Sequence, residues 1–249
     1  MSRLEEGQVY PVRVIADVTR RCNLSCWYCH SSSGPSYKGP ELTSEDVRNI
    51  YQAAETRQVF DISLTGGEPT MWPVLAEAME QSRTLVYPAL LLITNATALS
   101  EQKLEILKRG NLKRVCVSLD GESEVHDTNR GRGTFERTLG GILALREIVD
   151  DVTVISVLDK SNCDKWWILT ERLARMGVSQ QHLAPVSFAG GAMSDYRGLT
   201  KDQFALVRRK VEEVKKELPA GFILRFNDIL VNGPEGDTIS LHSFTEGVK

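Results

Sequence analysis

Short apolar runs rich in β-branched residues alternate along the chain with helix-like stretches. Apolar runs of this kind favour strands, and the stretches between them are long enough for helices. The pattern predicts strands at residues 12–18, 59–64, 89–93, 114–119, 152–158 and 181–186. It predicts helices at residues 44–57, 72–83, 101–109, 135–149, 164–176 and 201–218.

The alternation of six strands with six helices indicates βαβ units around a parallel sheet. Capping-box signals at Thr43 with Asp46, and at Thr200 with Gln203, mark two helix starts. Because crossovers between parallel strands are right-handed, successive units would curl into an open barrel. We therefore predict an α/β fold, a partial (β/α)6 TIM-like barrel in which the helices lie outside the parallel sheet.

Charge and cysteine content narrow the possible partners and the cellular compartment of the protein. Lys and Arg number 30 against 33 Asp and Glu, so no basic field favours a nucleic-acid partner or an anionic membrane. No apolar stretch is long enough to span a bilayer and the first residues hold no apolar signal core, so we expect a cytoplasmic protein. Three of the five cysteines fall within eight positions, which favours a metal site in a reducing compartment over disulfides.

Polar or glycine-rich segments directly follow each of the first four predicted strands. In parallel α/β barrels the active site lies at the carboxyl ends of the strands, so these segments are expected to meet there. They are residues 22–29 (CNLSCWYC), residues 65–69 (TGGEP), Thr94 with Asn95, and residues 118–121 (SLDG).

The three clustered cysteines, Cys22, Cys26 and Cys29, have the spacing CxxxCxxC. Thiolates are the usual ligands of iron–sulfur clusters, and a four-iron cubane held by three thiolates keeps one iron open. An open iron can chelate the amino and carboxylate groups of a small molecule and pass an electron into its sulfonium. The alternatives are three unrelated thiols or a zinc site, for which His30 is the only nearby fourth ligand.

A CxxxCxxC loop after an N-terminal strand resembles the signature of the radical S-adenosylmethionine (SAM) superfamily. The resemblance implies a 4Fe-4S cluster on the three cysteines that cleaves SAM reductively to methionine and a 5'-deoxyadenosyl radical. This radical would abstract hydrogen from a peptide or small-metabolite substrate. The resemblance also implies a one-electron donor such as flavodoxin or ferredoxin.

Two further motifs resemble those of the same superfamily. Residues 66–69 resemble its GGEP motif, which binds the methionine amino group, although four such residues alone could form a plain turn. Residues 126–135 (HDTNRGRGTF) resemble the HDxxRGxGxF pattern of peptide-maturing and cofactor-building members. The alternative for Arg130 and Arg132 is a solvated, glycine-rich loop.

The resemblance assigns SAM contacts along the whole barrel. Ser118 and Arg130 would hold the SAM carboxylate, Tyr28 would lie near the adenine, and Ser156 would touch the ribose if its strand face points inward. Trp27 is expected to pack the loop onto the barrel. The full set of expected SAM-binding residues is Tyr28, Gly66, Gly67, Glu68, Pro69, Asn95, Ser118, Asp120, Arg130, Ser156, Ala184 and Pro185.

We expect the core barrel to cover residues 1–199, and residues 200–249 to add a last helix and a tail. The tail would pack on the core or lead to a Cys-rich auxiliary-cluster domain of the SPASM or twitch type, which relatives with HDxxRGxGxF commonly carry. No cysteine follows Cys163, so either the natural chain lacks that domain or the sequence stops before it. Two other functions stay open, an activase that places a glycyl radical on a partner protein and a non-catalytic metal-binding barrel.

Overall fold

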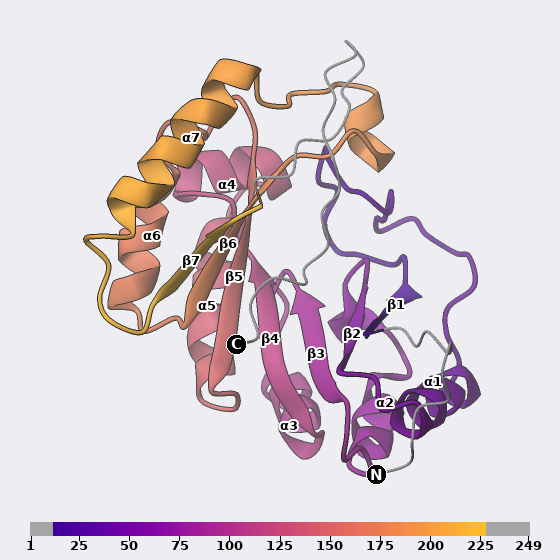
Figure 1. The fold of residues 1–249 in the computed structure, drawn as a ribbon. Helices are drawn as coiled ribbons and strands as arrows, with labels where there is room; N and C mark the ends of the chain where they lie inside the picture. Colours follow the sequence, from indigo (N-terminus) through magenta and orange to yellow (C-terminus); the bar gives the residue numbers. More distant parts are fainter. Residues whose placement is uncertain (1–11, 228–249) are drawn as a thin grey trace, which may run out of the picture.

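One parallel sheet organises residues 12–227, which are the residues that the computed structural model describes (Figure 1). Its seven strands lie in the order of the sequence, and each pairs in parallel with the next. The strands are β1 (Arg13–Thr19), β2 (Asp61–Gly66), β3 (Ala89–Thr94), β4 (Leu112–Ser118), β5 (Asp151–Leu158), β6 (Gln180–Pro185) and β7 (Ile223–Phe226). Within the described residues β1 and β7 are the two edges of the sheet, so the predicted α/β fold and partial barrel are confirmed.

Most helices lie along the outside of the curved sheet, whereas the short helix at residues 123–130 lies near the carboxyl ends of the strands (Figure 1). The helices are α1 (Ser44–Thr56), α2 (Leu75–Ser82), α3 (Glu101–Arg109), α4 (Ser123–Arg130), α5 (Thr134–Arg146), α6 (Trp166–Arg175) and α7 (Lys201–Val214). Two short 3-10 turns, η1 (Pro69–Met71) and η2 (Gly190–Met193), follow β2 and β6. Between residues 12 and 227 no helix is both long and apolar enough to cross a membrane.

The helix starts that the sequence marks are present. Thr43 and Asp46 form a capping box at α1, and Thr200 and Gln203 form one at α7. In each case the hydroxyl of the threonine accepts a bond from a first-turn N–H group that has no partner inside the helix.

Two elements were not predicted from the sequence, α4 and β7. The sequence pattern assigns no helix to residues 123–130 and no strand to residues 223–226. In the structure β7 pairs with β6 and α7 packs beside it, with Leu224, Val207 and Val211 in one apolar cluster. The rest of the predicted segment 200–249, from residue 228 on, lies outside the described residues.

Burial alternates along β1 and separates the two faces of the sheet there. On this strand Ala16 and Val18 are buried toward the helices, whereas Ile15, which precedes them, is 66% exposed and Asp17 between them is also exposed. The apolar face therefore fixes the helices, since burial of apolar side chains drives their packing. The opposite face lines the inside of the open barrel, and its carboxyl end leads to the candidate site.

Candidate functional site

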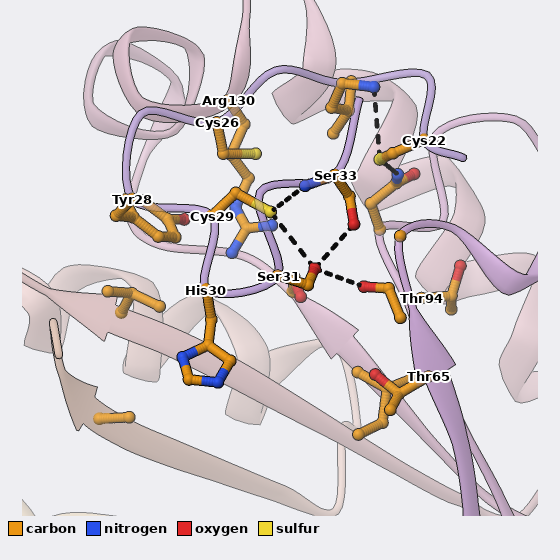
Figure 2. Close-up of a pocket in the computed structure, with 18 of the residues that line it drawn as sticks. Cys22, Cys26, Tyr28, Cys29, His30, Ser31, Ser33, Thr65, Thr94 and Arg130 are labelled. Carbon is orange, nitrogen blue, oxygen red and sulfur yellow. Dashed lines mark hydrogen bonds between the residues drawn. The ribbon is translucent and has the colours of Figure 1, made fainter. Parts of the chain in front are cut away.

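A cavity of about 300 Å³ opens at the carboxyl ends of the strands. All three motif cysteines line it, together with residues from the ends of β2 to β6 (Figure 2). Eight of the predicted SAM-binding residues also line it, namely Tyr28, Gly66, Gly67, Asn95, Ser118, Arg130, Ala184 and Pro185. The other four, Glu68, Pro69, Asp120 and Ser156, lie outside its lining.

The sulfur atoms of the loop receive several hydrogen bonds. The backbone N–H of Leu24 donates to Cys22 Sγ at 3.4 Å, and that of Ser33 donates to Cys29 Sγ at 3.3 Å (Figure 2). Asn95 Nδ2 lies 3.8 Å from Cys22 Sγ. Bonds of this kind stabilise charge on a coordinating thiolate and tune an attached cluster.

The thiols of Cys22 and Cys26 are protonated at neutral pH without a metal. Burial raises the pKa of Cys22 to about 11, and burial also raises the pKa of Cys26. None of the cysteines forms a disulfide. Because only thiolates bind metal strongly, loading of this site must release protons.

The arrangement of the cysteines fits a cluster better than a single zinc ion. A structural zinc site takes four protein ligands, whereas the motif supplies three thiols to the cavity. A cubane takes each thiolate on a different iron, so its ligands can be spread along one wall of a cavity. The imidazole of His30 points away from the three sulfur atoms, which does not suit a fourth zinc ligand (Figure 2).

Gly66 and Gly67 bring the end of β2 against residues 19–21, the segment that leads into the cysteine loop. Gly66 has a φ of +125°, and a Cβ on it would lie 2.1 Å from the Thr19 carbonyl oxygen. A Cβ on Gly67 would lie 2.3 Å from the Arg21 carbonyl oxygen. The glycines therefore allow two backbone segments of this chain to pack closely, and their predicted contact with SAM stays a prediction.

The Glu68 carboxylate is fully buried just behind the cavity lining. Its Oε1 accepts bonds from the Thr70 backbone at 3.0 Å and from the hydroxyls of Thr70 and Thr94 at 2.8 and 2.7 Å. Its Oε2 accepts a bond from the Asn95 backbone at 2.7 Å. Glu68 therefore ties η1 to the end of β3, and its contact with the methionine ammonium stays a prediction.

Arg130, Asp120 and Tyr28 form a buried group. Arg130 Nε and one terminal nitrogen donate to the two Asp120 oxygens at 2.9 and 3.0 Å, and the Tyr28 hydroxyl also donates to Asp120. Burial alone would raise the pKa of Asp120, but the Arg130 charge and its bonds outweigh burial and hold that pKa below its usual value. Asp120 thus orients Arg130 and Tyr28, both of which reach the cavity, while lying outside its lining itself.

Two more buried side chains support this group. His126 Nδ1 accepts a bond from the Asp120 backbone at 3.2 Å, and burial lowers the pKa of His126 to about 4, so the ring is a neutral acceptor. The Ser156 hydroxyl donates to the Leu119 carbonyl at 2.6 Å and accepts from Gln181 at 2.9 Å. Ser156 is fully buried, and its ribose contact stays a prediction.

The segment after β6 packs on the cysteine loop. The Gly191 N–H donates to the Cys29 carbonyl at 2.9 Å. A Cβ on Gly190 would lie 2.2 Å from the Cys29 oxygen, and one on Gly191 would lie 2.4 Å from the Trp27 oxygen. The loop is held from its other side by Trp27, whose indole N–H donates to Asn129 of α4 at 3.0 Å.

Sequence reasoning placed Thr94 beside Asn95 and quoted His126 and Asn129 within a motif, but it assigned no role to these residues or to Gly191. Thr94 immediately precedes the predicted contact Asn95 at a strand end, so its position was a usable signal. Asn129 and Gly191 act through partners far away in the sequence, Trp27 and Cys29, and a pattern of neighbouring residues carries no such information. His126 bonds to Asp120 six residues before it.

The chain belongs to the radical SAM superfamily. The profile of that superfamily matches residues 17–173, which is more than half of the chain and includes both the cysteine loop and the residues of α4. The family is one of enzymes, and it implies SAM and a 4Fe-4S cluster as cofactors.

The names of individual relatives describe different activities. The sporulation killing factor maturation protein SkfB of Bacillus subtilis is 30% identical over 82% of this chain and 50% of its own length. The AdoMet-dependent heme synthase of Methanosarcina barkeri is 31% identical over 69% of this chain and 50% of its own length. The chain thus spans about half the length of these relatives.

Among solved structures, Streptococcus suis SuiB bound to precursor peptide SuiA superimposes with a TM-score of 0.72. The match covers 87% of this chain and 49% of that chain at 17% identity, and it supports the fold.

Proposed function

We propose that this chain is the catalytic core of an enzyme that modifies a peptide by radical chemistry. When bound, a 4Fe-4S cluster on Cys22, Cys26 and Cys29 would supply the electron that splits SAM into methionine and a 5'-deoxyadenosyl radical. The observation that carries the proposal is that these cysteines share one cavity with Tyr28 and Arg130.

The residues of the chain would bind and orient SAM in this cavity. The Arg130 guanidinium, fixed by Asp120, is a planar cation that suits the SAM carboxylate. The backbones at Gly66 and Gly67 and the side chain of Asn95 supply polar groups along the wall next to the cysteines. The 3-10 turn η2 packs over the loop and helps to keep water from a reactive radical.

A peptide substrate is supported by the relative SkfB, whose name describes the maturation of a sporulation killing factor. A small metabolite is the second candidate, because the heme synthase is a relative of similar identity. The electron would come from a protein such as flavodoxin or ferredoxin.

The test compares the wild-type chain with Cys26→Ala and with Cys163→Ala, a buried cysteine outside the cavity. After anaerobic reconstitution, the wild type and Cys163→Ala should bind about four irons per chain, and Cys26→Ala should lose most of them. Reduction with dithionite in the presence of SAM should yield 5'-deoxyadenosine, measured by liquid chromatography, from the first two proteins only.

Equal iron in Cys26→Ala and the wild type would refute the cluster assignment. Iron binding without any deoxyadenosine would favour the non-catalytic barrel. Capture of a large partner protein that then acquires a glycyl radical, detected by electron paramagnetic resonance, would favour the activase.

A further inference from the structure

A second pocket lies across the cysteine loop from the first. The side chains of Cys22, Cys26 and Tyr28 line the SAM cavity, whereas the intervening residues Ser25 and Trp27 line the second pocket. Its other wall comes from the end of α4 and the start of α5. The cysteine loop therefore separates a surface pocket from the proposed site of chemistry.

The lining of this pocket is strongly cationic. It contains Arg130, Arg132 and Arg137 and no Asp or Glu. Arg130 is paired with Asp120, but neither Arg132 nor Arg137 forms an ion pair with any residue in 12–227. Both are exposed, so two positive charges beside the loop lack a counterion in the described part of the chain.

The start of α5 adds nothing to this charge. The nearby Asp127 already accepts bonds from the backbone N–H groups of Gly133 and Phe135 at 2.6 and 2.9 Å, so it occupies the helix N-terminus. The attraction for an anion comes instead from the two arginine side chains and from one buried amide.

That amide belongs to Asn129, which is 3% exposed and lines the pocket. Its Oδ1 accepts the bond from Trp27, and since an indole N–H can only donate, this contact fixes which end of the amide faces Trp27. Its Nδ2 is left buried with no hydrogen-bond partner among the described residues. A buried donor without an acceptor is unfavourable, so the pocket is incomplete without an acceptor such as a carboxylate oxygen.

We propose that this pocket binds a carboxylate side chain of the electron-donor protein, a small acidic one-electron carrier. The proposal rests on the proposed function, because the carrier needs only to come near the loop while SAM and substrate occupy the other side. Arg132, Arg137 and Asn129 would form charge-assisted hydrogen bonds to the carboxylate. At this contact one electron leaves the reduced carrier for the cluster, and no atom is transferred.

The test uses the reconstituted full chain carrying Arg132→Gln and Arg137→Gln together, and separately Asn129→Asp. The aspartate still accepts the bond from Trp27 but repels an anion. Deoxyadenosine formation is measured once with dithionite, which needs no docking, and once with reduced flavodoxin or reduced ferredoxin. The control is Arg57→Gln with Arg109→Gln, two exposed arginines outside both pockets that give the same change in net charge.

We expect the Arg132/Arg137 variant and the Arg57/Arg109 control to match the wild type with dithionite. Because Asn129 also holds Trp27, Asn129→Asp is compared by the ratio of its carrier-driven rate to its own dithionite-driven rate. With the protein carrier, the Arg132/Arg137 variant should be about tenfold slower at low salt, and salt should then slow it less than it slows the wild type. Asn129→Asp should change in the same direction, and the Arg57/Arg109 control should behave as the wild type.

Three outcomes overturn the docking proposal alone. The first is an unchanged carrier-driven rate in the Arg132/Arg137 variant. The second is an equal loss of rate in this variant with dithionite, which would assign the pocket to SAM or substrate. The third is failure of both carriers to support deoxyadenosine formation by the wild type. By contrast, a wild type that makes no deoxyadenosine with dithionite overturns the proposed function itself.

Discussion

Asp120 is the residue on which the buried charge of the site depends. Its side chain is fully buried, and the Arg130 side chain that it holds is only 8% exposed. Taking two charges out of water is costly, and the pair is tolerated because its two hydrogen bonds are well formed and Tyr28 adds a third. Removal of one partner therefore costs more than removal of both.

We predict that Asp120→Asn lowers the free energy of unfolding of the metal-free protein by about 3–5 kcal/mol, because Arg130 is left as an unpaired buried charge. Urea denaturation followed by circular dichroism measures this. The control is Glu80→Gln, which breaks an exposed pair with Arg83 and should cost less than about 1 kcal/mol.

The double variant Asp120→Asn with Arg130→Met distinguishes the cost of an unpaired buried charge from the cost of altered side-chain packing. It should recover part of the stability that Asp120→Asn loses, because no charge remains buried alone. Equal losses in the single and double variants would mean that the ion pair is not what stabilises this region.

The sequence predicted which residues gather at the site but not how they are bonded. Glu68 and Asp120 were expected in contact with SAM, because motif and strand order place them at the carboxyl end of the sheet. In the structure their carboxylates lie behind the lining and bind Thr94 and Arg130, and their contacts with SAM stay predictions. Such contacts depend on distances between separate βα units, which local patterns do not encode.

At the scale of elements, the cysteine loop is held between α4 and η2. Gly191 is close to the backbone of Trp27, and its N–H binds the Cys29 carbonyl. We predict that Gly191→Ala displaces the loop, since its Cβ would lie 2.4 Å from a backbone oxygen. Iron should then pass to a chelator about tenfold faster or more from the reconstituted protein, as is typical when the support of a metal ligand is lost.

The matched control is Gly140→Ala in α5, where a Cβ would meet nothing within 4 Å. It should hold iron as the wild type does and gain slightly in stability, because alanine favours a helix over glycine. Equal iron release from Gly191→Ala and the wild type would show that η2 does not fix the loop.

The two elements that the sequence did not reveal have a common cause. Residues 123–130 are mostly polar, and α4 buries only Val125, His126, Asn129 and Arg130. The β7 strand is four residues long and only Leu224 is buried. Periodicity needs several apolar positions to be recognised, so short elements that are stabilised by tertiary contacts escape it.

For the whole molecule, the apolar core is divided into two clusters. The larger cluster packs β1 to β5 against α1, α2, α3, α5 and most of α6, and it includes Ile62 and Val117. The smaller cluster packs the end of β5, β6 and β7 against α7 and the start of α6, and it includes Leu183 and Val207. The superfamily match ends at residue 173, so α7 and β7 lie after the matched residues, and they depend on the smaller cluster.

We predict that α7 and β7 open as a local unit at a lower free energy than β2 to β4, because fewer apolar side chains hold them.

Val207→Ala and Val117→Ala each remove two methyl groups from a fully buried position, at a cost of about 2 kcal/mol. In hydrogen exchange read by mass spectrometry, Val207→Ala should speed exchange in α7 and β7 only. Val117→Ala should speed exchange in β2 to β4 as well, since the larger cluster reports global unfolding. A uniform response to both substitutions would instead mean that the sheet unfolds as one unit from β1 to β7, with no boundary between the two clusters.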